Sequence, residues 1–80
     1  MKISKEIEDV VYELEYVKRK FPGYKSVHEG YAVILEELDE LWDEIKKPRK
    51  ERNNATMYLE AKQVACTAIR FMEMLNYENK

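Results

Sequence analysis

The chain of 80 residues has little of what interrupts or cross-links a fold. It contains one cysteine, two glycines and two prolines, so no internal disulfide can form and few tight turns are available. No apolar run approaches the roughly 18 residues of a membrane span, and the N-terminal sequence MKISKEIEDV lacks the apolar core of a signal peptide. We therefore expect a cytoplasmic protein with no membrane partner.

The chain also lacks an excess of basic charge. Its 14 Lys and Arg residues stand against 16 Asp and Glu, a net charge of -2, whereas nucleic-acid binders present a basic surface. We expect no nucleic-acid partner. A composition of 45% hydrophobic and 38% charged residues is typical of an amphipathic helical domain rather than a disordered chain. Residues 1–80 would form one small domain, marginally stable unless it associates.

Apolar residues recur at spacings of three and four in three segments, which predicts three α-helices. We expect these helices at about 4–20, 27–46 and 56–76, with breaks at Pro22 and Pro48. The short connections favour antiparallel packing of neighbouring helices. The predicted fold class is therefore all-α, with three antiparallel helices per chain.

Polar residues that cap helices precede each of these segments. Ser4 is the expected N-cap of the first helix. Ser26 with Glu29 three residues later fits a capping box at the start of the second. For the third helix, both Asn54 and Thr56 are suitable caps.

The third segment is apolar on more than one side. A main stripe with small residues runs along it, yet Leu59, Cys66, Ile69 and Met74 lie away from that stripe. A helix of this kind is buried on more than one side, which three helices in 80 residues do not readily achieve. We expect oligomerisation to a homodimer or homotetramer that completes a bundle of four or more helices.

The second segment, from 26 to 45, lacks any Lys or Arg and holds seven carboxylates. Its apolar residues recur on one helical face, namely Tyr31, Ile34, Leu38, Leu41 and Ile45. With Leu38 at the centre, about 100° per residue puts Glu37, Glu40 and Glu44 along one flank.

Like charges at these spacings repel by a few tenths of a kcal/mol per pair, so a compensating partner is expected. One candidate is a hard divalent cation such as Mg²⁺. The alternative is a solvated acidic face neutralised by bases from another helix. A second polar line on the third segment, Glu60, Gln63 and Thr67, would face the acidic flank if the two helices pack antiparallel.

Two stretches of the chain resemble a known enzyme family. They are SVHEGYAVILEELDELWDEIKK at 26–47 and EAKQVACTAIRFMEML at 60–75, which cover about half of the chain. They are similar to the all-alpha nucleoside triphosphate pyrophosphohydrolases, the MazG-like superfamily, and most of all to a short phage- and prophage-type branch. In that family an ExxE pair on one helix and an ExxD pair on the next hold Mg²⁺ for hydrolysis of a nucleoside triphosphate to a monophosphate and pyrophosphate.

The resemblance implies a set of metal ligands and catalytic residues in this chain. Glu37 and Glu40 match the first pair, Glu60 begins the second, and Gln63 stands where the family has Asp. The implied ligands of Mg²⁺, or of Mn²⁺, are thus Glu37, Glu40, Glu60 and Gln63. The implied catalytic residues are Glu36, Glu37 and Glu40.

The sequence leaves open which residues would orient the attacking water and bind the phosphates. Either Glu36 or Glu44 could orient the attacking water, and the sequence does not choose between them. Lys62 is a candidate for steadying the substrate phosphates. The basic loop at 46–52 is either a solvated loop that compensates helix dipoles or a surface that attracts a polyphosphate.

The departure at Gln63 leaves two functions to consider. A Gln carbonyl can coordinate a hard cation but brings no charge, so metal affinity should fall. The first function is a Mg²⁺-dependent pyrophosphohydrolase of ribo- or deoxyribonucleoside triphosphates, which the unneutralised acidic flank favours. The second is a non-catalytic helical module that binds a nucleotide or a protein and has lost part of its metal site, which Gln63 favours.

Overall fold

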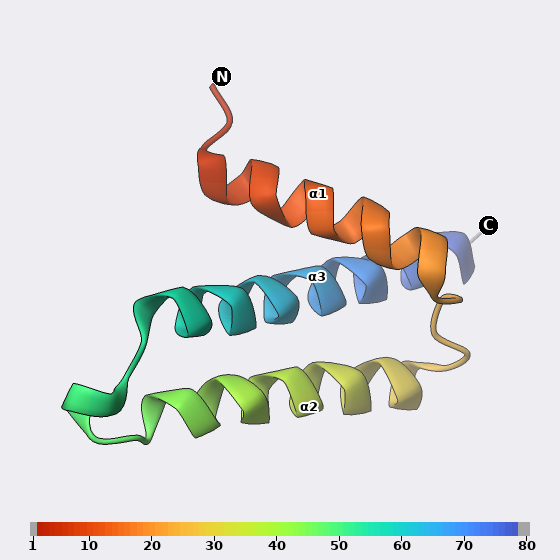
Figure 1. The fold of residues 1–80 in the computed structure, drawn as a ribbon. Coiled ribbons are helices and arrows are strands. Elements are labelled where there is room, and N and C mark those ends of the chain that lie inside the picture. Colours follow the sequence, from red (N-terminus) through yellow and green to blue (C-terminus); the bar gives the residue numbers. More distant parts are fainter. Residues whose placement is uncertain (1, 79–80) are drawn as a thin grey trace.

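The computed structural model describes residues 2–78 and contains three α-helices (Figure 1). They are α1 (Lys5–Lys20), α2 (Val27–Ile45) and α3 (Asn54–Glu78), with a short 3₁₀ turn, η1 (Arg49–Glu51), between the last two. No strand occurs in this part of the chain, so the predicted all-α class is confirmed. None of these helices has the length and apolar character needed to cross a membrane.

The first two helices begin at the serines that the sequence marked. The Ser4 hydroxyl accepts a hydrogen bond from the Ile7 N–H at 3.3 Å, and the Ser26 hydroxyl accepts one from the Glu29 N–H at 3.0 Å. Each bond satisfies one of the N–H groups that a helix start leaves without a partner. At Ser26 this is the only one of the two capping-box bonds that forms among the described residues.

The start of α3 differs from the expectation. The Asn53 side chain accepts a hydrogen bond from the Thr56 N–H at 3.1 Å, and its backbone carbonyl accepts one from Met57 at 3.0 Å. Asn53 is therefore the cap, rather than Asn54 or Thr56, and the helix begins two residues before the expected position 56. Three cap-forming residues occur within four positions, so residue type alone does not select among them.

α3 is the central element, because α1 and α2 each pack against it and not against each other in the described chain (Figure 1). Polar contacts tie α1 to α3 at both ends. Near the start of α1, the Tyr58 hydroxyl donates a hydrogen bond to Asp9. Near its end, Lys18 Nζ lies 3.1 Å from Glu73 Oε2. The two outer helices are thus held on different sides of α3.

The predicted apolar face of α2 is divided in the structure. Ile34 and Leu41 are half-buried, whereas Tyr31, Leu38 and Ile45 remain exposed. The α2 residues that are at least partly buried are Gly30, Val33, Ile34, Glu37, Leu41 and Glu44. The helix is therefore rotated so that two glutamates lie on its packed side and much of its apolar surface is left uncovered.

The chain taken alone has almost no hydrophobic core. Among the hydrophobic side chains of the described residues, only Cys66 is fully buried, and burial raises the pKa of its thiol. Thr67 beside it is also buried, and its hydroxyl donates to the Val64 carbonyl at 2.9 Å. A core this small contributes little to stability.

Gly30 lies in close contact with two aromatic rings outside α2. A Cβ placed there would lie 2.5 Å from Cδ2 of Phe71 and 3.0 Å from Cδ2 of Tyr24. The Tyr24 hydroxyl in turn donates to the Thr67 carbonyl at 3.3 Å. Even a methyl group at position 30 would overlap the Phe71 ring, so the ring or the helices would have to shift.

Replacing Gly30 with Ala is expected to lower the free energy of unfolding, although Ala is the better helix former by about 1 kcal/mol. Overpacking costs about 1–3 kcal/mol, and the contact with the Phe71 ring leaves no room for a methyl group. Gly23→Ala is the matched control, since nothing lies within 4 Å of its added Cβ. Urea unfolding at one protein concentration would show a loss only for Gly30→Ala, and equal midpoints for the two variants would refute the contact.

Candidate functional site

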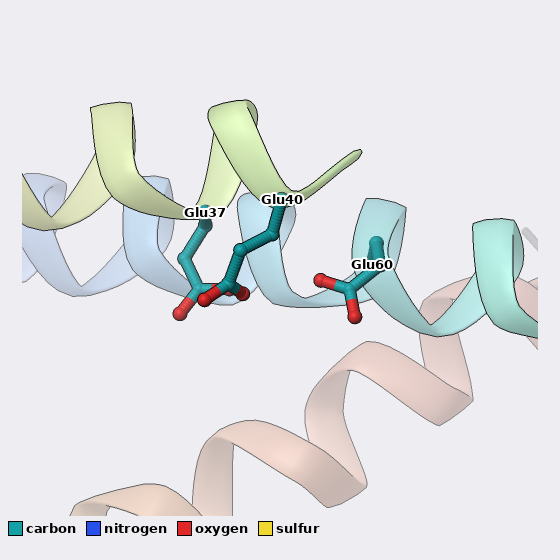
Figure 2. A group of neighbouring side chains, drawn as sticks. All are labelled: Glu37, Glu40 and Glu60. Atoms are coloured by element: carbon teal, nitrogen blue, oxygen red, sulfur yellow. The ribbon is translucent and has the colours of Figure 1, made fainter. Parts of the chain in front are cut away.

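Three glutamates from two helices meet at one place. Glu37 and Glu40 lie one turn apart on α2, and Glu60 projects from the N-terminal part of α3. Each offers a carboxylate oxygen, and these oxygens all lie within 4.8 Å of one another. Figure 2 shows the carboxyl groups of Glu37 and Glu40 close together, with that of Glu60 turned toward them from α3. We call these three residues the carboxylate cluster.

The connection between α2 and α3 brings the cluster together and also occupies nearby bases. Arg52 Nε donates to the carbonyl of Ile45, the last residue of α2, at 2.7 Å and to that of Lys47 just beyond it at 3.0 Å, which closes the turn. Lys46 pairs with Asp43 and Lys47 with Glu44, each at 3.0 Å. These bases neutralise carboxylates outside the cluster. Within the part of the chain that the structure describes, no Lys or Arg pairs with the cluster itself.

The electrostatics of the cluster follow from burial and like charge. Burial raises the pKa of Glu37 to about 7, and the carboxylates of Glu40, Glu60 and Glu36 add to the rise. Burial also raises the pKa of Glu60, with Glu40 as the next cause. Both shifts mean that the ionised form is disfavoured. A positive charge placed among these oxygens would relieve both effects.

One atom of the cluster is without any partner. Oε2 of Glu60 is shielded from solvent and accepts no hydrogen bond from the described residues. Buried polar atoms in proteins nearly always have a partner, because an unsatisfied one costs about 1–3 kcal/mol. An oxygen-only donor set with a free, shielded oxygen fits a hard divalent cation such as Mg²⁺, which prefers carboxylate and water oxygens.

A cavity of about 420 Å³ adjoins the cluster. Glu36, Glu37 and Gln63 contribute to its polar wall. The remaining lining residues come from all three helices and from the residue after α1: Val17, Phe21, Val33, Cys66, Thr67 and Arg70. Its volume lies in the range of about 300–1,000 Å³ found for small-molecule sites. Glu36 and Gln63 thus lie beside the cluster, at the border of the cavity.

Two of the candidate residues are placed elsewhere. Lys62 Nζ lies 3.5 Å from Glu13 Oε1, so it joins α3 to α1, and both side chains are mostly buried. It lines a different hollow, beside Tyr58, and not the cavity next to Glu37. Glu44 forms an ion pair with Lys47. Of Glu36 and Glu44, only Glu36 borders the cavity.

Arg70 is a cavity residue that the spacing and motif patterns of the sequence do not mark. Its Nη2 donates to the Pro22 carbonyl at 2.8 Å, and its guanidinium lies 4.7 Å from the centre of the Tyr24 ring. The residue therefore anchors the turn between α1 and α2 at the edge of the cavity. The pairing joins positions 48 residues apart in the chain, and no local spacing signals such a contact.

The raised pKa of Glu37 predicts how stability changes with pH in metal-free protein. Its carboxyl group titrates near 7 in the folded state against 4.5 in the unfolded chain. Between these values the folded state binds more protons, so stability should fall as pH rises from about 4.5 to about 7 and then level off. Thermal melting in a chelator would show a weaker fall for Glu37→Gln. An identical pH dependence in both proteins would mean that Glu37 titrates normally.

No protein family, characterised protein or solved structure matches this chain at a significant level. What the site can do is therefore judged from its own chemistry. Three carboxylates from two helices and one shielded oxygen without a partner among the described residues form a group that could hold a cation, next to a cavity large enough for a small molecule.

Proposed function

We propose that this chain is a MazG-like, Mg²⁺-dependent nucleoside triphosphate pyrophosphohydrolase, which converts ribo- or deoxyribonucleoside triphosphates to monophosphates and pyrophosphate. The observation that supports this most is the meeting of Glu37, Glu40 and Glu60 on the two helices that carry the motif resemblance, with no compensating base among the described residues. We place the enzyme in the cytoplasm, where its proposed substrates are made and used.

Glu37, Glu40 and Glu60 would hold the Mg²⁺, or Mn²⁺, and the side-chain oxygen of Gln63 would be the fourth, uncharged ligand. When bound, the cation neutralises phosphate charge and makes a nearby water more acidic. The unpartnered oxygen of Glu60 is a donor that needs no rearrangement of other contacts. Because Gln63 adds no charge, three carboxylates must suffice to hold the cation against solvent.

The carboxylates of α2 would also handle the proton of the attacking water. In the reaction, water attacks phosphorus, the bond between the α- and β-phosphoryl groups breaks, and pyrophosphate leaves. A carboxylate of α2 that does not hold the cation is free to accept the proton that water releases. Glu36 is exposed, borders the cavity and adjoins Glu37, so we assign it the orientation of that water.

The cavity beside the cluster would receive the nucleoside. Val17, Phe21 and Val33 provide apolar surface for a base, and Thr67 and Arg70 provide polar groups at its edge. The triphosphate would then extend from this cavity toward Glu37 and the cluster. Lys62 faces Glu13 instead, so a role for it at the phosphates would require that ion pair to open.

We further propose that the chain acts as a homodimer or homotetramer, with the bundle of four or more helices completed between subunits. The sparse core supports this, since Cys66 is the only fully buried hydrophobic side chain among the described residues. Large exposed apolar side chains occur on all three helices. Association would cover them and supply the burial that a chain of this size lacks.

Turnover of a panel of ribo- and deoxyribonucleoside triphosphates tests the proposed reaction. With Mg²⁺ or Mn²⁺ present, we expect equal amounts of pyrophosphate and nucleoside monophosphate, and neither product when the metal is chelated. Release of inorganic phosphate with a diphosphate product would instead indicate a different phosphatase reaction. The panel also identifies the preferred base and sugar.

A non-catalytic nucleotide- or protein-binding module is the second candidate function, favoured by Gln63 in place of an acid. It predicts binding of a nucleoside triphosphate without any product, on protein that remains folded and assembled. Equilibrium dialysis with a non-hydrolysable triphosphate analogue, run beside the turnover panel, separates the two functions. Binding without turnover supports the module.

A further inference from the structure

The outer side of α2 carries a continuous apolar stripe that nothing in the described chain covers. We call it the α2 stripe, formed by Val27, Tyr31, Leu35, Leu38, Trp42 and Ile45, all of which are exposed. Tyr31 is 64% and Trp42 56% exposed. These residues recur at spacings of three and four, so they share one side of the helix. Glu37 and Glu40, by contrast, are directed toward α3 and the space in front of it (Figure 2).

The surface of the chain is larger than a compact monomer of its mass would have. Its accessible surface is 6461 Å² at 9.6 kDa, about 1,400 Å² more than the roughly 5,100 Å² expected of a folded monomer of this mass. A standard interface buries only about 800 Å² on each partner. The excess is therefore enough for a stable subunit interface, and the α2 stripe runs along this surface from Val27 to Ile45.

The exposed residues of the α2 stripe pair about a point between Leu35 and Leu38. Leu35 and Leu38 lie on either side of this point, and Tyr31 and Trp42 lie about one turn further out on each side. A two-fold symmetric interface requires this property, because residue i contacts residue j and j contacts i. Spacings of three, four and seven are also those of helices that pack along their length.

We infer that α2 pairs antiparallel with α2 of a second copy of this chain, about a two-fold axis between Leu35 and Leu38. Leu38 then lies against Leu35 of the second copy, and Tyr31 lies against Trp42. Asp39 and Asp43 lie about 100° and 140° around the helix from Leu38, and Asp43 already pairs with Lys46, so the acidic residues stay off the contact line. The pairing leaves the carboxylate cluster accessible and does not depend on nucleotide hydrolysis.

Thiol cross-linking tests the predicted axis directly. Leu38→Cys, treated with a short bis-maleimide, should give mostly covalent dimer, because the two introduced thiols lie across the axis. Asp43→Cys is the matched control, because Asp43 is exposed and lies about 140° around α2 from Leu38. Cys66 is buried, so the unmodified chain should not cross-link. Equal cross-linking of the two variants, or none for Leu38→Cys, would overturn the pairing.

Sedimentation provides a second, independent readout. Leu38→Glu places like charges across the axis and should weaken self-association at least about tenfold, while Asp39→Asn should not. Trp42 is the only tryptophan, so its fluorescence should shift to longer wavelength as it becomes exposed in Leu38→Glu. If Leu38→Glu fails to fold by circular dichroism, the cross-linking comparison decides. Unchanged association of a folded Leu38→Glu protein would contradict the interface.

Discussion

Replacing Glu40 with Gln is expected to lower the metal-dependent rate of pyrophosphate release by about a hundredfold or more. The substitution keeps the shape of the side chain and removes one of the three charges of the carboxylate cluster. Metal ions contribute several kcal/mol of transition-state stabilisation, and each loss of about 1.4 kcal/mol is tenfold in rate. Steady-state rates at saturating Mg²⁺ and triphosphate measure the effect.

Asp39→Asn is the matched control for this experiment. Asp39 is the neighbouring acid on α2, is exposed, and does not belong to the cluster. The two variants make the same change of charge one position apart, so a general electrostatic effect would lower both rates alike. We expect the Asp39→Asn rate to stay within about twofold of the unmodified enzyme. Equal losses would remove the special role of Glu40.

Replacing Gln63 with Asp is expected to raise the melting temperature when Mg²⁺ is present and to lower it when the metal is removed. With Mg²⁺, a fourth carboxylate should tighten metal binding by about tenfold or more, because the added charge lies near the cation. Without metal, it adds a like charge beside Glu37, whose pKa is already raised to about 7, and should lower stability. Melting temperatures in Mg²⁺ and in chelator would therefore separate more widely than in the unmodified chain.

Asn76→Asp controls for the exchange of an amide for an acid on the same helix. Asn76 is exposed near the other end of α3, far along the helix from Glu60. Its substitution should leave the difference between the two melting temperatures unchanged. If Gln63→Asp behaves like Asn76→Asp, position 63 does not contribute to a metal site. A gain in turnover by Gln63→Asp would further show that the Gln limits activity.

The helical composition of the fold was predictable because apolar spacing and cap residues are local signals. Ser4 and Ser26 start their helices in the structure as expected. The cap of α3 was not predictable, because Asn53, Asn54 and Thr56 are all good caps. Only the conformation of the preceding turn selects Asn53. The position of such a helix end depends on the path of the adjoining loop, which the spacing of apolar residues does not indicate.

The side on which α2 packs was also beyond the reach of the sequence. A helix with a broad apolar surface offers two directions for burial, and helical spacing alone does not say which one meets the neighbouring helix. In the structure Glu37 is half-buried while Leu38 stays exposed. Close contact at Gly30 with Phe71 fixes the rotation of the helix. This contact joins residues 41 positions apart, so no local sequence pattern indicates it.

The candidate site was predictable in part. Glu37, Glu40 and Glu60 could be placed on two facing helices from spacing and motif resemblance, and the structure brings their oxygens together. The position of Lys62 beside Glu13 was not foreseen, because helical spacing does not say which neighbouring helix a side chain meets. The cavity formed with residues of α1 such as Val17 required the tertiary arrangement as well.

Binding of Mn²⁺ measured by electron paramagnetic resonance tests the central claim, that Glu37, Glu40 and Glu60 together hold a divalent cation. The signal of free Mn²⁺ is lost on binding, so titration of the purified chain counts sites without any need for turnover. We predict saturable binding that Mg²⁺ displaces, that Glu60→Gln weakens at least about tenfold and that Asp39→Asn leaves unchanged. No saturable binding at millimolar Mn²⁺, or equal binding by Glu60→Gln, would contradict the metal site.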